Sequence, residues 1–169
     1  MAAFFAYGED YLKRDDFLAL AFNDSSADAH STPPPPTQAQ MQTLWLTAEM
    51  KAAAQQRVGW VPRALRLRYW QADSRSAWIL EHIGKEKPIT FGVVVREGRI
   101  ERVEVLAFRE SRGWEIRYPF FTEQFGGVGL AEDGYLTGHI DGITGATLSV
   151  RAAEKVARMA LWLDAQVRE

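Results

Sequence analysis

The sequence of 169 residues contains no cysteine. Without thiols the chain can form no disulfide, iron–sulfur cluster, thiolate metal site or c-type haem attachment, and it has no thiol nucleophile. Any redox chemistry must then come from an organic cofactor or from a metal held by other ligands. The three histidines, His30, His82 and His139, lie far apart and form no paired metal motif. The sequence therefore gives no support to a metal enzyme.

The chain also has no large excess of either sign of charge, and it has no long apolar run. The chain has 20 Lys and Arg against 22 Asp and Glu, a formal net charge of -2. This balance lacks the basic footprint of a nucleic-acid-binding protein, so we expect no DNA or RNA partner. No stretch approaches the length of a membrane-spanning helix. The apolar residues 1–6 are too short for a complete secretory signal, but they could be the remnant of one.

What is present suits one domain with an appended arm. Hydrophobic residues make up 47% of the chain and include six tryptophans, which is enough for a core. Residues 9–22 have apolar side chains at helical spacing, and the polar segment after them ends in four prolines, residues 33–36. We assign residues 1–40 to an N-terminal helix and Pro-rich arm that packs on the main body or on a partner. Residues 41–169 form the main domain.

The pattern of the main domain predicts an α+β fold, an antiparallel sheet with flanking helices. A helix is expected over residues 48–57, with Thr47 as its N-cap and Gly59 at its end. Strands are expected over residues 65–70, 77–83, 89–95 and 100–108, with a hairpin turn at residues 96–99. A closing helix follows, in which Leu148 and five further apolar residues up to Leu163 recur at helical spacing.

Just before that helix lies the stretch Asp-Gly-Ile-Thr-Gly-Ala-Thr-Leu-Ser, residues 141–149. Unpaired N–H groups and the positive end of the helix dipole gather at such a turn and make it an anion site. Gly145 and Ala146 leave room beside the hydroxyl of Thr147, to which a large planar group could be attached. The alternative is that Thr144, Thr147 or Ser149 simply caps the helix.

This stretch resembles the flavinylation motif of the FMN-binding domain family, which occurs in the periplasmic subunits of sodium-pumping NADH:quinone reductase and of the Rnf complex. The family motif is Asp-x-x-Ser/Thr-Gly-Ala-Thr/Ser, and the matching residues are Asp141, Thr144, Gly145, Ala146 and Thr147. The resemblance implies that a flavin transferase moves FMN from FAD onto Thr147. A phosphoester bond would then hold the cofactor.

Residues 110–114 support the resemblance. In the family, the strand after the hairpin ends in Glu-Thr-Pro-Gly and a bulky residue, and this turn touches the isoalloxazine. Glu110, Ser111 and Gly113 fit the pattern, Trp114 takes the bulky position, and Arg112 replaces the proline. The resemblance implies that the backbone around Gly113 donates to the pyrimidine ring of the flavin and that Trp114 stacks on its face. The alternative for Trp114 is a place in the core.

Four neighbouring side chains have two interpretations each. Phe120, Phe121 and Phe125 either fill the core, which we favour, or close the pocket. His139 either ends a strand, which we favour, or approaches the phosphate.

The resemblance is strongest over residues 77–163, and it implies a flavoprotein that carries electrons on covalent FMN. Its partners would be the flavin transferase and other redox proteins, membrane-bound ones included. Its compartment would be the periplasm or another extracytoplasmic space, with possible attachment to a membrane. We expect an electron-transfer protein rather than an independent enzyme. Two alternatives stay open: a flavin-dependent reductase domain with its own substrate, and an unflavinylated binding or interaction module of the same fold.

Overall fold

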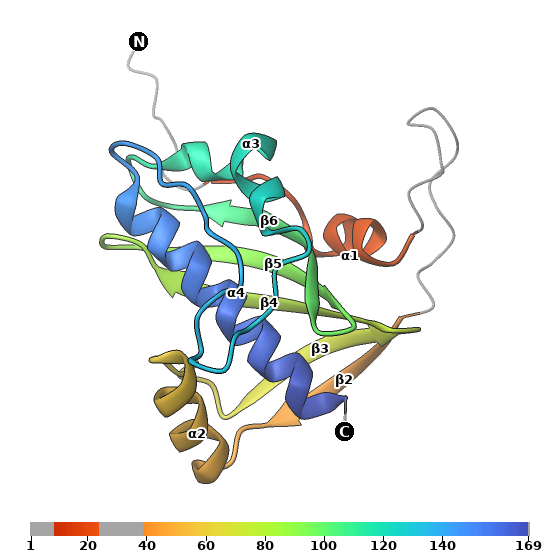
Figure 1. The fold of residues 1–169 in the computed structure, drawn as a ribbon. Helices are drawn as coiled ribbons and strands as arrows, with labels where there is room; N and C mark the ends of the chain where they lie inside the picture. The colour runs from red at the N-terminus through yellow and green to blue at the C-terminus, as the bar shows by residue number, and fades with distance from the viewer. Residues whose placement is uncertain (1–8, 24–38, 169) are drawn as a thin grey trace.

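A computed structural model describes residues 9–23 and 39–168 of the chain. Six strands form one antiparallel sheet in the order β1-β6-β5-β4-β3-β2, and helices lie on both of its faces (Figure 1). The predicted α+β class is confirmed. The four prolines at residues 33–36, His30 and the apolar residues 1–6 lie outside the described residues.

The strands are β1 (Glu9–Asp10), β2 (Gln40–Trp45), β3 (Arg66–Ala72), β4 (Arg75–Ile83), β5 (Pro88–Arg96) and β6 (Arg99–Phe108). The α-helices are α1 (Arg14–Phe22), α2 (Ala48–Val58), α3 (Pro119–Thr122) and α4 (Thr147–Val167), and two 3-10 helices are η1 (Trp114–Arg117) and η2 (Glu123–Phe125). Each strand expected from the sequence is present with slightly different ends. The hairpin turn between β5 and β6 is also confirmed, with Glu97 and Gly98 at positive φ.

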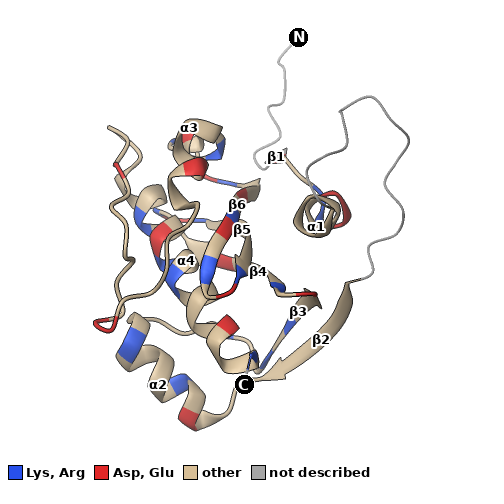
Figure 2. Ribbon diagram, turned by 45° about the vertical axis from the view of Figure 1, so that its right-hand side comes forward, with Lys and Arg blue, Asp and Glu red and all other residues tan. Residues whose placement is uncertain are grey.

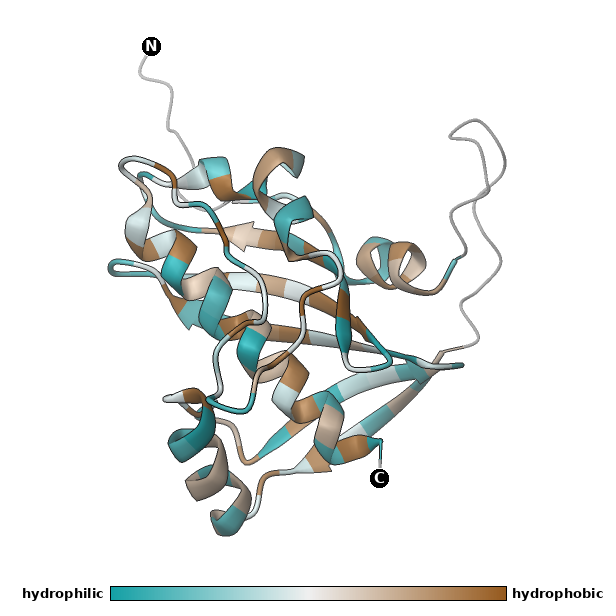
Figure 3. Cartoon of the chain, viewed as in Figure 1, coloured by the Kyte–Doolittle hydropathy of each residue, from teal (hydrophilic) through white to brown (hydrophobic). Residues whose placement is uncertain are grey.

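The main core lies between α4 and the central strands. Trp78, Phe91 and Val93 of the sheet are fully buried and pack in one cluster with Val156, Met159 and Leu163 of α4. This is the apolar stripe that the spacing predicts, and Figure 3 shows it along α4. Leu148 is the exception, because it lies 44% exposed at the start of the helix.

Helix α1 covers the opposite face of the sheet, as the views in Figures 1 and 2 show. Its Phe17 is fully buried and lies over Gly92, where a Cβ atom would come within 2.5 Å of the ring. The prediction that this helix starts near residue 9 is wrong, since Glu9 and Asp10 pair with β6. The next two N–H groups, of Tyr11 and Leu12, both donate to the carbonyl of Leu106. Sheet pairing therefore delays the helix to Arg14.

Helix α2 has the ends that the sequence predicts. The side chain of Thr47 accepts a hydrogen bond from the N–H of Met50, and Gly59 ends the helix in the left-handed conformation. The indole N–H of Trp60, the next residue, donates to the carbonyl of Lys155 at 2.9 Å. This bond fixes the end of α2 against α4.

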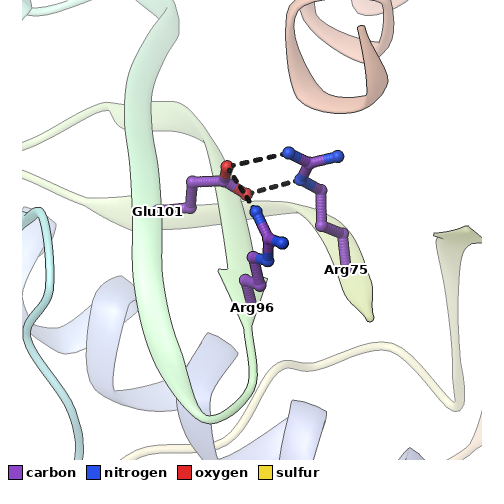
Figure 4. A network of polar contacts seen from close by, with 3 residues as sticks. All are labelled: Arg75, Arg96 and Glu101. Atoms are coloured by element: carbon purple, nitrogen blue, oxygen red, sulfur yellow. Dashed lines mark hydrogen bonds and ion pairs between the residues drawn. The ribbon is translucent and has the colours of Figure 1, made fainter. Parts of the chain in front are cut away.

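Charged residues of both signs are interspersed along the ribbon (Figure 2). One group ties three strands together: Glu101 of β6 accepts two hydrogen bonds from Arg75 of β4, and Arg96 of β5 lies 3.9 Å away (Figure 4). Arg75 is mostly buried, so this bidentate pair is shielded from solvent better than an ordinary surface pair.

The three phenylalanines before the Gly-Gly pair separate into two groups. Phe121 and Phe125 are fully buried and meet edge to face, which confirms the core interpretation for both. Phe120 is 61% exposed and stacks beside Tyr118. For Phe120 the core interpretation is wrong.

Candidate functional site

A cavity of about 390 Å³ lies at the N-terminal end of α4, where two segments that the sequence singles out meet. One wall is the turn after β6, the other is the start of α4, and the turn between β4 and β5 closes the side. The residues that line the cavity are Lys85, Glu110, Ser111, Arg112, Gly145, Ala146, Thr147, Leu148 and Ser149. The fold therefore brings residues 110–112 and 145–149 to one place.

Thr147 is the first residue of α4 and is exposed. The N-cap is Ala146, which offers no side-chain acceptor, so none of the three hydroxyl residues caps this helix. The capping alternative for Thr144, Thr147 and Ser149 is therefore wrong. The N–H of Val150 donates to the carbonyl of Ala146 at 3.0 Å. The N–H groups of the three preceding residues are those that an α-helix leaves without an internal partner.

The turn that leads into α4 depends on Gly145. Its φ of +84° lies in the left-handed region, and the N–H of Ala146 closes the turn by donating to the carbonyl of Ile143. A Cβ atom on Gly145 would meet no atom within 4 Å. The backbone conformation thus requires the glycine, in addition to its predicted role of leaving space beside Thr147.

Gly113 joins the two walls of the cavity. It has φ +90°, and a Cβ atom there would lie 2.6 Å from Ser149 Oγ and 3.4 Å from the Ala146 side chain. The turn after β6 can therefore approach α4 only because residue 113 has no side chain. Ser149 itself is buried in this contact.

Glu110 fixes the turn between β4 and β5, which closes the side of the cavity. Its Oε1 accepts hydrogen bonds from the N–H groups of Lys85, Glu86 and Lys87, at 2.6, 2.6 and 2.8 Å. Burial acts to raise the pKa of Glu110, but the three N–H donors and the charge of Lys87 outweigh it, so the pKa lies below its usual value. This carboxylate fixes the turn between β4 and β5 beside the cavity.

Two cations of the cavity, Lys85 and Arg112, were not among the site residues expected from the sequence. In the sequence Arg112 is only a departure from the family pattern, and Lys85 lies 62 positions before Thr147 in the chain. Together with the N–H groups of α4 they make the cavity attractive to an anion. Leu148, expected in the core, supplies an apolar side chain at the same place.

Asp141, Thr144 and His139 lie in the exposed turn before α4 and outside the residues that line the cavity. The N–H of Asp141 donates to Gln124 Oε1 at 2.7 Å, and its carboxylate lies 3.3 Å from His139 Nε2. His139 is in a loop rather than at the end of a strand. These residues shape the approach to Thr147 and do not enclose it.

Trp114 also lies outside the residues that line the cavity, and at 40% exposure it is not in the core either. Its ring meets Tyr118 edge to face at 5.8 Å, and the guanidinium of Arg117 lies 5.5 Å from its centre. The stacking of Trp114 on a flavin stays a prediction.

No helix within the described residues is long and apolar enough to cross a membrane. In the same part of the chain, no group of three or more His, Asp or Glu side chains could hold a metal ion.

Comparison with known protein families matches residues 84–161 to the FMN-binding domain. The matched segment includes every residue that lines the cavity. This match confirms the resemblance found in the sequence. A search of curated proteins found no match.

Proposed function

From the FMN-binding domain that the chain carries over residues 84–161, we propose that the protein is an electron carrier with FMN attached covalently to Thr147. The observation that carries this proposal is the place of Thr147: its exposed side chain stands at a cavity lined by both predicted segments. The cavity of about 390 Å³ falls in the range of small-molecule sites, roughly 300–1,000 Å³.

The residues present fit FMN in charge as well as in size. A phosphodiester on Thr147 would carry a negative charge beside Lys85, Arg112 and the N-terminal N–H groups of α4. Leu148 offers apolar contact to the ring system, and Glu110 and Gly113 hold the surrounding turns in place. These residues bind and orient the cofactor, which supplies the redox chemistry when bound.

We propose that a flavin transferase makes the bond from FAD. The hydroxyl oxygen of Thr147 bonds to the phosphorus on the FMN side of the pyrophosphate, the P–O bond to the other phosphate breaks, and AMP leaves. The hydroxyl proton passes to a base of the transferase or to water, and no electron is transferred. The exposure of Thr147 at a helix end supports this step, because a second protein must reach the hydroxyl.

The proposed role as an electron carrier rests on the covalent bond between FMN and Thr147. A covalent bond prevents loss of FMN, which suits a protein in an extracytoplasmic compartment such as the periplasm, with redox proteins as partners, membrane-bound ones included. A flavin-dependent reductase would instead need its own small substrate. Reduced, flavinylated protein that is reoxidised in turnover by a small organic acceptor at the rate of an enzyme would support the reductase and contradict the carrier.

The attachment is tested by co-expression with a flavin transferase. We expect the protein to gain the mass of FMN less one water, and the denatured polypeptide to fluoresce in a gel. The Thr147→Ala variant should lose both signals, and Thr147→Ser should keep them because only a hydroxyl is required. Thr144→Ala, in the same exposed turn, should remain flavinylated to an appreciable extent.

Two results would contradict the proposal. Flavin located by peptide mass spectrometry on Thr144 or Ser149 would move the site. Folded wild-type protein that stays unmodified with an active transferase, one shown to modify another substrate in the same cells, would leave the interaction module as the function.

A further inference from the structure

The sheet splits between β3 and β4. The two strands pair only from Ala72 and Arg75 at their turn to Tyr69 and Trp78. Beyond this point β4 continues through residues 79–83 and pairs with β5 alone, while β3 continues toward Arg66 and pairs with β2. Figure 1 shows β3 and β4 together at their hairpin and apart at the other end. Residues 79–83 are thus a strand edge in the middle of the sheet.

The main-chain groups of Ile79, Glu81 and Ile83 face the split. In an antiparallel pair, successive residues turn their N–H and C=O groups alternately toward one neighbour and the other. Pro88, which has no N–H, stands opposite Ile83, and the Ile83 carbonyl lies 2.8 Å from His82 Nδ1. The turn settles the direction, because the N–H of Gly84 donates to the carbonyl of Lys87 and the next pair, Ile83 and Pro88, is then a non-hydrogen-bonded one. Ile83 therefore turns its groups away from β5, and by alternation Glu81 and Ile79 do the same.

These groups have no strand beside them. Within the described residues, no backbone hydrogen bond links residues 79–83 to the chain on the β3 side. Glu81 and Ile83 are exposed, so this edge is open to solvent. An unpaired strand edge is a template for another strand.

A largely apolar groove of about 560 Å³ runs along the same edge. Trp60 and Pro62, from the segment after α2, form one wall, and Leu67 and Leu80 lie on the strands. Trp60 is fixed there by its bond to the carbonyl of Lys155 and by its edge-to-face contact with His82 at 4.9 Å. The groove is therefore built from side chains that are held in place.

We propose that this groove binds an extended peptide segment of a partner protein, which adds as a strand along residues 79–83 of β4. Strand addition gives affinity through main-chain bonds and selectivity through pockets for alternate side chains. The edge supplies the bonds, and the apolar wall selects apolar side chains at every second position of the peptide. About five residues, each extending about 3.3 Å, would occupy the edge.

The peptide site does not depend on covalent FMN. The groove ends at Ile83 and Pro88, and the turn between them carries Lys85, which lines the cavity beside Thr147. A partner held at the groove would therefore lie next to that cavity.

Seven-residue random peptides displayed on phage, selected against the purified protein, provide the probe. We expect the selected peptides to carry apolar residues at alternate positions and to contain no proline in the centre. The best one, made synthetically, should slow the amide hydrogen exchange of Ile79 and Glu81. The absence of any selected binder, or a binder that leaves the exchange at these two amides unchanged, would overturn the proposal.

Methylation of the peptide's own N–H groups distinguishes strand addition from simple insertion of side chains. Methylating the alternate set that faces β4 should weaken binding by about tenfold or more, because each lost main-chain bond contributes about 1 kcal/mol. Methylating the other set should leave the dissociation constant within about threefold. A peptide that tolerates both patterns would be an apolar ligand of the groove, and the added strand would be refuted.

A matched pair of protein variants completes the test. Ile83→Pro removes an outward N–H near the end of β4 without removing a bond to β5, and we expect at least about fivefold weaker peptide binding. Ile83→Thr keeps the N–H and should bind more tightly than the proline variant. Circular dichroism establishes that both fold, and the peptide-methylation experiment decides the question if the proline variant does not.

Discussion

Gly113 lies against Ser149, where the two walls of the cavity meet. We expect Gly113→Ala to destabilise the protein by about 1–3 kcal/mol, because the new Cβ would lie 2.6 Å from Ser149 Oγ and φ would stay at +90°. The free energy of unfolding in urea measures this loss. Flavinylation at Thr147 should fall in parallel, as the turn after β6 moves away from α4.

A second substitution separates the contact with the Ser149 hydroxyl from the strain of the positive φ. Ser149→Ala removes the hydroxyl that the new Cβ would meet, so the double variant with Gly113→Ala should recover part of the lost free energy of unfolding. The strain of a positive φ at residue 113 should account for the part that is not recovered. Full recovery would mean that the backbone at residue 113 tolerates a side chain. An unchanged loss would mean that the hydroxyl contact contributes nothing.

Trp114 offers a second test at the scale of single residues. Its ring packs against Tyr118 and Arg117 and is not among the residues that line the cavity. If the ring keeps this place in the flavinylated protein, Trp114→Leu should leave the emission of the bound flavin nearly unchanged. A marked rise in emission would show that the ring does stack on the flavin, as the family resemblance implies.

The sequence predicted the residues of the site that are close neighbours in the chain. Thr147, Ala146 and Gly145 belong to one short motif, and a glycine turn before an apolar helix has an evident geometry. Lys85 could not be predicted, because it reaches the cavity through pairing of β4 with β5 and through the N–H groups of their turn, which donate to Glu110. Local pattern carries no information about such distant pairing.

At the scale of elements, α1 is held to the sheet by buried side chains, of which Phe17 is the largest. Phe17 is fully buried and lies over Gly92, while Leu20 on the same helix is 44% exposed. We expect Phe17→Ala to destabilise the packing of α1 by about 3 kcal/mol or more, and Leu20→Ala to have a small effect. Hydrogen exchange should become faster in α1 and stay slow in α4. Equal acceleration in both helices would show that α1 and the main core unfold as one unit.

The difference between buried and exposed positions also explains which elements could be predicted from the sequence. The elements with strong apolar patterns are the buried ones, namely strands β4, β5 and β6 and helix α4. Their patterns predict them correctly. Strand β2 is almost wholly exposed and its sequence, Gln-Met-Gln-Thr-Leu-Trp, has little apolar alternation. Strand β1 has two residues and exists through its pairing with β6. Elements made by tertiary pairing leave a weak local signal.

At the scale of the whole molecule, two carboxylates make stability depend on pH in opposite directions. Glu110 has a lowered pKa, so its contribution is complete above its ordinary value of 4.5 and is lost as the pH falls through the lower value of the folded state. Asp164 is buried against Ser76 and Arg168, and burial raises its pKa above the ordinary 3.8 despite both partners. In the folded protein Asp164 takes up a proton at a higher pH than in the unfolded chain. The free energy of unfolding therefore declines as the pH rises from the ordinary pKa to the raised pKa of the folded state.

Urea unfolding at a series of pH values from roughly 3 to 7 checks this prediction. Relative to Glu110→Gln, the wild-type protein should lose stability on acidification. Relative to Asp164→Asn, it should gain stability on acidification. Parallel curves for wild type and either variant would show that the corresponding carboxylate has the same pKa in the folded and unfolded protein.

Thr147 is the first residue of the 21-residue helix that closes the main core. Helix α4 packs through most of its length on the sheet, so it cannot leave without exposing its own Met159 and the buried tryptophan and phenylalanine side chains beneath it. Segments of this kind open only with the whole protein, and small domains unfold with half-lives from below about one second to days. Whatever is bonded to Thr147 would keep its place for the lifetime of the native state, through a very large number of encounters with passing partners.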